Sequence, residues 1–163
     1  MGAALSDQLK VIWTESLVMS EELLEDLRSA FESFDKSLGT REATEHLREA
    51  IDLYLDILDS ENCSEANKKI AKQLGETYWW IFCKRVQVIA DDPGSYDLDT
   101  YMLWFEPALA FRNADIGQKY LNETILWALI ESMNEALPSN ERRPREALEK
   151  MMQESLEELK KQE

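Results

Sequence analysis

Apolar side chains recur every seven residues near the start of the chain, with two more placed between them. The repeat is carried by Leu17, Leu24, Phe31 and Leu38, and the intervening positions by Leu27 and Phe34. This spacing places the apolar groups on one stripe of an α-helix. It predicts a helix from about Ser6 to Gly39, with Ser20 as an alternative start and Gly39 as a left-handed residue at its end.

The next segment separates apolar and acidic side chains onto opposite faces of a predicted helix, which we expect Thr40 to cap. At about 100° per residue, one face gathers Ala43, Leu47, Ala50, Ile51, Tyr54, Ile57 and Leu58. The opposite face carries six acids at alternating spacings of three and four residues, here named the acid ladder: Glu42, Glu45, Glu49, Asp52, Asp56 and Asp59. A solvated face needs polar residues, but it does not require all of them to be acidic. The ladder is therefore also a candidate docking surface.

Capping and turn residues mark the middle of the chain. Ser64 is a predicted cap for a helix that ends before the turn at 91–97, and Asp97 caps the next helix. We expect Pro107 to interrupt that helix, either as the first-turn residue of a new segment or as a kink, because proline has no backbone N–H to continue the hydrogen-bond ladder. The inward face of the 64–91 helix is expected to hold Ile70, Ala71, Leu74, Tyr78, Ile81, Phe82, Val88 and Ile89.

Two more helices complete the predicted architecture. One covers 115–137, with Tyr120 among its inward residues, and the other covers 144–163. The last is amphipathic and either docks on the bundle or binds a partner. No stretch shows the alternation of a β-strand. The pattern predicts an all-α protein, a single compact bundle-like domain of five to six helices over 1–163.

Residues 47–62, followed by 74–78, resemble one tetratricopeptide unit and the start of the next. The second-helix positions of that repeat are occupied by Leu47, Ala50, Ile51, Tyr54 and Leu58, and its first-helix signature by Leu74, Gly75 and Tyr78. Glu61 stands where the repeat has proline, and no further copy is visible. Because such stacks need at least three repeats, the resemblance implies only two antiparallel helices packed through Ala50 and Gly75.

Acidic residues outnumber lysine and arginine by 33 to 18, which gives the 163-residue chain a formal net charge of −15. This charge disfavours direct binding to nucleic acid or to an anionic membrane, and it suits a basic partner. Cys63 and Cys83 are the only cysteines. With no secretory signal or membrane-spanning run in the sequence, we expect reduced thiols in a cytoplasmic protein.

The single histidine, His46, lies among acids of the ladder and invites interpretation as a metal ligand. A di-iron carboxylate site draws on a second histidine, so we expect no metal and no cofactor. Arg41 and His46 also resemble the Arg-x4-His motif of HEPN-type ribonucleases, which are helical dimers. On one regular helix these two side chains diverge by about 140°, and the acids repel RNA. No glycine-rich phosphate loop is present, and we expect the protein not to be an enzyme.

Two adjacent tryptophans, Trp79 and Trp80, stand in the aromatic run 78–82. Neighbouring helix positions point about 100° apart, so the two rings cannot share one narrow seam. With the main apolar face turned inward, Trp80 falls on the opposite side. We predict Trp79 in the core and Trp80 at an interface, because tryptophan is enriched at binding hot spots. Arg85 is expected to pair with an acid of another helix.

These features predict a non-catalytic, acidic helical protein-interaction module: an adaptor, a chaperone-like binder or an inhibitor. Its partner is expected to be another protein with a basic or apolar groove. A second copy of the same chain, forming a homodimer, is also a candidate partner. The candidate docking residues are the acid ladder and Trp80. The first alternative is an acidic mimic of nucleic acid that occupies a basic groove. The second is a HEPN-like ribonuclease that uses Arg41 and His46.

Overall fold

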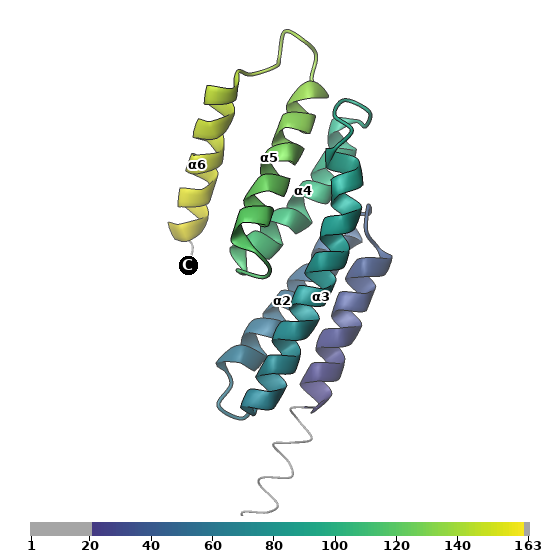
Figure 1. Ribbon diagram of the computed structural model, residues 1–163, viewed down its shortest axis with the longest axis vertical. Coiled ribbons are helices and arrows are strands. Elements are labelled where there is room, and N and C mark those ends of the chain that lie inside the picture. The colour runs from purple at the N-terminus through teal and green to yellow at the C-terminus, as the bar shows by residue number, and fades with distance from the viewer. Residues whose placement is uncertain (1–20, 162–163) are drawn as a thin grey trace, which may run out of the picture.

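The computed structural model describes residues 21–161, and all regular secondary structure in that range is helical (Figure 1). A first helix covers 21–36. It is followed by α2 (Glu42–Asp59), α3 (Glu65–Ala90), α4 (Leu98–Asn113), α5 (Lys119–Glu135) and α6 (Arg145–Lys161). The prediction of an all-α, bundle-like fold is confirmed. The predicted helix start at Ser6 and the alternative start at Ser20 lie outside the described residues.

Helix α3 connects the two halves of the bundle (Figure 1). The first helix and α2 lie along its lower half in this view, and α4 and α5 lie in the upper half. Aromatic rings fill the centre: the ring centroids of Phe34, Phe82 and Phe111 are 5.4 to 5.9 Å apart. These three residues come from the first helix, α3 and α4, so one aromatic cluster holds three helices together.

Helices α2 and α3 are joined by a short turn and pack side by side, as the tetratricopeptide resemblance implied. Ala50 is fully buried. A Cβ added to Gly75 would lie 3.1 Å from the ring of Tyr54, so the missing side chain allows α2 to approach closely. Gly75 also lies near Ile116, which follows α4. The residues that resembled a repeat therefore serve a single helix pair.

The helix starts show which capping predictions were correct. The Ser64 hydroxyl accepts a hydrogen bond from the backbone N–H of Asn67 at 3.1 Å, and the Asp97 carboxylate accepts one from Thr100 at 2.8 Å. Both caps are confirmed. The prediction for Thr40 is wrong, because Arg41 holds the N-cap position of α2 without a side-chain cap. The Thr40 hydroxyl instead donates to the carbonyl of Ser37 at 2.6 Å.

The prediction that Pro107 begins a new segment is also wrong, because Pro107 lies inside the continuous helix α4. Proline removes one hydrogen bond of the helix ladder. It does not end α4, because the residues on either side are fixed by packing. Tyr101 and Phe111 are fully buried before and after it, and Pro107 is itself buried. Tertiary contacts thus outweigh the local cost of one missing N–H donor.

Helix α5 begins at Lys119, later than the predicted 115. The connection from α4 contains two residues with positive φ, Asp115 at 57° and Gly117 at 88°. These left-handed conformations are incompatible with a continuing right-handed helix. The first helix likewise ends at residue 36, earlier than predicted, although Gly39 does adopt the expected positive φ of 85°.

Helix α6 lies alongside α5 (Figure 1). An ion pair joins Arg145 to Glu131 of α5 at 3.4 Å, and the Arg145 guanidinium lies 5.7 Å from the centroid of the Trp127 ring. Met152 is buried. These contacts lie in the first half of α6, and the prediction that the helix either docks on the bundle or binds a partner stays a prediction. None of the helices in the described part of the chain has the length and apolar character needed to cross a membrane.

Candidate functional site

The acid ladder forms the outer face of α2. All six of its side chains are exposed, as the sequence predicted. Within residues 21–161, none of them forms an ion pair with a lysine or arginine. The backbone amide of Glu42 at the start of the helix lowers the pKa of the Glu42 carboxyl. The ladder therefore presents six carboxylates to solvent, none of them within ion-pair distance of a lysine or arginine among residues 21–161.

Part of the ladder borders a shallow groove of about 540 Å³ between the first helix and α2. Glu49, Asp52 and Asp56 line the groove together with Asp26, which the first helix contributes. His46, partly buried, lines the same groove. The sequence did not indicate Asp26, because the periodicity of one helix does not show which side chains its neighbour supplies. The groove concentrates negative charge from two helices.

The two residues of the ribonuclease hypothesis lie at the start of α2. Arg41 is exposed at the N-cap, and His46 faces the acidic groove. An RNA phosphate beside His46 would lie close to the carboxylates of the groove, which repel it. In the described range, no three His, Cys, Asp or Glu side chains are grouped closely enough to hold a metal ion.

Cys83 lies in the core of α3, next to the aromatic cluster, and its side chain is buried. Desolvation raises the pKa of the Cys83 thiol to about 12. The thiol therefore stays protonated at neutral pH and is a poor nucleophile. Cys83 therefore contributes to the core by packing.

Trp79 belongs to a buried polar network that joins α3 to the start of α5. Its indole N–H donates to the side-chain oxygen of Asn122 at 2.7 Å. The Asn122 amide nitrogen donates in turn to the carbonyl of Ile116 at 2.9 Å. Trp79 is 5% exposed, and Gly117 lies directly against its ring. The core position of Trp79 is confirmed, whereas the role of Asn122 was not apparent from the sequence.

Trp80 lies on the outside of α3 and is 48% exposed. The ammonium group of Lys84 lies 5.5 Å from the centroid of its ring, in a cation–π contact. Val88 is also exposed, contrary to the prediction that it faces inward. Trp80, Lys84 and Val88 are spaced four residues apart, so they follow one side of the helix. We name these three residues the α3 outer face.

Two other predictions on side-chain orientation can be compared with the structure. Arg85 forms the expected interhelical ion pair, with Asp35 of the first helix at 3.2 Å, and its side chain is exposed. Tyr120 was predicted to face inward and is 83% exposed. The reason is the later start of α5, which makes Asn122, Ile125 and Leu126 the first buried positions of that helix.

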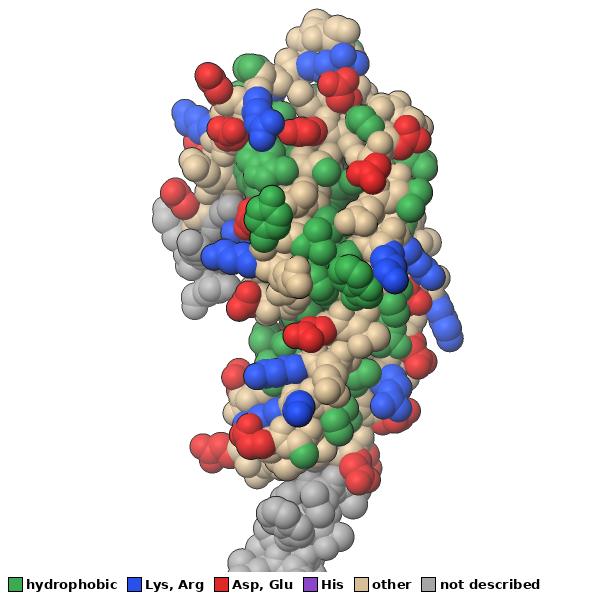
Figure 2. Space-filling model, viewed as in Figure 1, with side chains coloured by type: hydrophobic (Ala, Val, Ile, Leu, Met, Phe, Trp, Pro, Cys, Tyr) green, Lys and Arg blue, Asp and Glu red, His purple; other side chains and the backbone are tan. Residues whose placement is uncertain are grey.

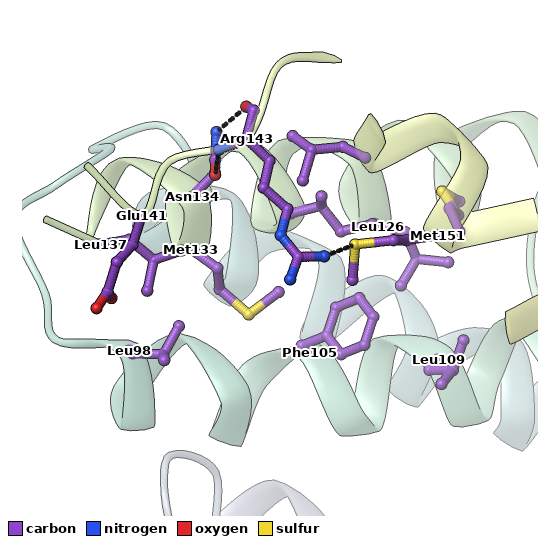
Figure 3. Close-up of a pocket in the computed structure, with 13 residues that line it drawn as sticks. Leu98, Phe105, Leu109, Leu126, Met133, Asn134, Leu137, Glu141, Arg143 and Met151 are labelled. Carbon is purple, nitrogen blue, oxygen red and sulfur yellow. Dashed lines mark hydrogen bonds between the residues drawn. The ribbon is translucent and has the colours of Figure 1, made fainter. Parts of the chain in front are cut away.

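Helices α4, α5 and α6 and the connection before α6 line an open pocket of about 720 Å³, which we name the α6 pocket (Figure 3). Its walls are mainly apolar and include Leu98, Phe105, Leu126, Met133, Met151 and Met152. Polar groups come from Asn134, Glu141 and Arg143 near the start of α6. The sequence did not indicate this pocket, because it depends on how three helices are arranged in space. The only sequence signal was the number of methionines in 133–152.

Three surfaces are thus candidates for a binding site, and they differ in chemical character. The acid ladder attracts basic side chains, the α3 outer face offers exposed apolar area, and the α6 pocket accepts apolar groups. Figure 2 shows hydrophobic side chains gathered across the middle of one face of the molecule, among charged side chains of both signs. Comparison of the chain with protein-family models, with curated proteins and with solved structures finds no match.

Proposed function

We propose that the protein is a non-catalytic protein-interaction module that binds a partner protein through the α3 outer face. The observation that carries this proposal is the exposure of Trp80, which is 48% accessible although the adjacent Trp79 is buried. Trp79 has a complete structural explanation in its hydrogen bond to Asn122. Trp80 has no comparable role in the fold, and an exposed tryptophan is a frequent centre of binding energy at interfaces.

Charge sets the chemistry of the proposed partner. The net charge of −15 and the exposed ladder favour a protein with a basic rim around an apolar groove. A second copy of this chain is the alternative occupant of the α3 outer face. The proposal includes a cytoplasmic location, which the two free, buried thiols of Cys63 and Cys83 support.

Trp80→Ala is expected to weaken partner binding at least about 30-fold, as for a hot-spot residue worth about 2 kcal/mol. The partner is first captured from a lysate on the immobilised protein and identified, and its affinity is then measured by calorimetry. Leu55→Ala, which removes an exposed apolar side chain from α2, is the matched control and should leave the affinity unchanged. Equal affinities of the native protein and Trp80→Ala would contradict the proposal.

The nucleic-acid mimic is a second candidate, and the ladder is the observation that favours it. Six exposed acids recur along α2 without an ion pair in the described range, and Asp26 adds a seventh carboxylate across the groove. Successive rungs of one helix face lie about 5.4 Å apart or less along the axis. A basic groove that normally holds phosphates would meet a similar row of negative charges.

Replacing Glu45, Asp52 and Asp59 by Gln, Asn and Asn tests the ladder without truncating it. Because these side chains are exposed and unpaired, each change should alter the free energy of unfolding by about 0.5 kcal/mol or less. Urea denaturation measures this. A large loss of stability would show that the ladder has a structural role. In the binding assay, loss of a salt-sensitive partner from the folded triple variant would favour the mimic over the α3 outer face.

The ribonuclease alternative is tested directly on RNA. Purified protein is incubated with labelled RNA, with and without the substitution His46→Ala. On the non-catalytic proposal, neither protein cleaves it. If the native protein cleaves RNA and the His46→Ala variant does not, the protein is an enzyme and the proposal of a non-catalytic interaction module is wrong.

A further inference from the structure

The α6 pocket has the size and lining of a site for a small apolar ligand. Its volume of about 720 Å³ falls within the range of about 300–1,000 Å³ that is usual for ligand sites. Leu126, Ile130 and Met133 line it from α5, and Leu148 and Met151 from α6. Such aliphatic and thioether side chains adapt to a flexible hydrocarbon chain. The pocket is lined by α4, α5 and α6, whereas the α3 outer face belongs to α3. Ligand binding in the pocket therefore does not depend on the proposed function.

One of the residues that line this pocket, Arg143, is an arginine without an ionic partner among the described residues. Three arginines occur within four positions at 142–145. Arg142 pairs with Glu135 at 3.7 Å, and Arg145 pairs with Glu131 and with Glu149, each at 3.4 Å.

Arg143, between them, forms no ion pair within 21–161. Its guanidinium points into the pocket and donates to the sulfur of Met151 (Figure 3). A thioether is a weak acceptor, so most of the N–H donors of the Arg143 guanidinium remain available to a ligand. This is notable because the chain has 33 acids that could pair with an arginine.

The fold holds Arg143 in this position through its backbone. The Asn134 side chain accepts a hydrogen bond from the Arg143 N–H and donates one to the Arg143 carbonyl, both at 2.9 Å. Asn134 belongs to α5, which also forms the pocket wall. This pair of hydrogen bonds fixes the segment before α6 against α5. The backbone from which the exposed Arg143 side chain extends is therefore held beside the pocket, and the contact with Met151 is the one that its guanidinium makes there among the described residues.

We infer that the α6 pocket binds a free amphipathic carboxylate with a long hydrocarbon chain, a ligand of the fatty-acid type. The chain would lie among the apolar walls, and the carboxylate would pair with the guanidinium of Arg143, whose planar fork of donors matches two carboxylate oxygens. Glu141 also lines the pocket, but its side chain points away from the Arg143 guanidinium (Figure 3). Of the acids on the neighbouring helices, Glu135 is paired with Arg142, and Glu131 and Glu149 are paired with Arg145.

The test compares decanoate, decanol and decyltrimethylammonium, which share one hydrocarbon chain and differ in charge. Each is titrated below its micellar concentration into the full-length protein, and binding is measured by calorimetry. Decanoate is expected to bind at one saturable site, about tenfold more tightly than either of the other two, because only the carboxylate pairs with Arg143. Equal affinity for all three would show an apolar groove without anion preference and would overturn the inference.

Arg143→Gln should remove about a tenfold preference for decanoate and leave the affinity for decanol unchanged. Arg142→Gln is the matched control: it removes the same charge one residue away, from a guanidinium paired with Glu135, and should leave the preference intact. Ile130→Trp, which fills the pocket, should weaken the binding of decanoate and decanol together.

Three further results would contradict the assignment. The first is the absence of saturable decanoate binding. The second is an equal loss of the preference for decanoate in Arg143→Gln and Arg142→Gln. The third is co-sedimentation of the protein with phosphatidylglycerol vesicles when it does not bind decanoate. The last outcome would point to a membrane surface in place of a free amphiphile.

Discussion

Trp79→Ala is expected to lower the free energy of unfolding by about 3–5 kcal/mol, the usual cost of deleting a buried large aromatic side chain. Two effects contribute. The ring, 5% exposed, fills the space between α3 and the start of α5, so its removal leaves a cavity. The side-chain oxygen of Asn122 also loses its donor inside the core, and an unsatisfied buried acceptor is itself costly. Urea denaturation followed by circular dichroism measures the change.

Trp80→Ala is the matched comparison, because it deletes the same side chain from the next position of the same helix. Half of this ring is already exposed, and it makes no hydrogen bond that supports the fold in the described range. Its cation–π and ring contacts in the described range are those with Lys84 and with the Trp79 ring, whose centroid is 6.0 Å away. We expect about 1 kcal/mol or less. Equal, severe losses in the two variants would show that Trp80 is also a core residue, and its role as an interface would be withdrawn.

The contrast between these two tryptophans was predictable because it depends only on the helical period. Once Tyr78 and Phe82 are placed inward, a rotation of about 100° per residue separates Trp79 from Trp80. The same reasoning predicted the exposure of the acid ladder opposite Leu47 and Tyr54. Properties of a single helix, its faces and many of its ends, are encoded in the order of residues along that helix.

Properties that depend on several helices were not predictable in this way. The continuation of α4 through Pro107 depends on the burial of Tyr101 and Phe111 against other helices. The start of α5 depends on a turn at Asp115 and Gly117, which shifted the predicted inward face and misplaced Tyr120. Each error occurred where packing or backbone conformation outweighed a local pattern.

The candidate sites show the same difference between features of one helix and features of several helices. The ladder and Trp80 lie on single helices, and the sequence identified them. The α6 pocket is formed by three helices, and its cation comes from the connection before α6. The sequence shows three arginines at 142–145, but it does not show that Glu135 and Glu131 pair with two of them and leave Arg143 over the pocket.

Gly117→Ala is expected to destabilise the fold by about 3 kcal/mol or more, through two separate effects. The first is backbone strain, because Gly117 has a φ of 88° and an L-residue with a side chain is disfavoured there. The second is steric: a Cβ at this position would overlap the buried indole ring of Trp79. The ring is held by its hydrogen bond to Asn122 and cannot move aside without breaking it. Thermal and urea unfolding of the variant measure the loss.

Gly94→Ala separates these two effects, because Gly94 has a similar φ of 81° and a Cβ added there would meet no atom within 4 Å. It should cost only the backbone strain, about 1–2 kcal/mol. The remaining cost at Gly117 should then depend on Trp79. In a Trp79→Ala background, Gly117→Ala is expected to cost no more than Gly94→Ala, since the overlapping ring is gone, and the double-mutant cycle reports this coupling. Additive losses would show that Gly117 acts through its backbone alone and that Trp79 does not pack against it.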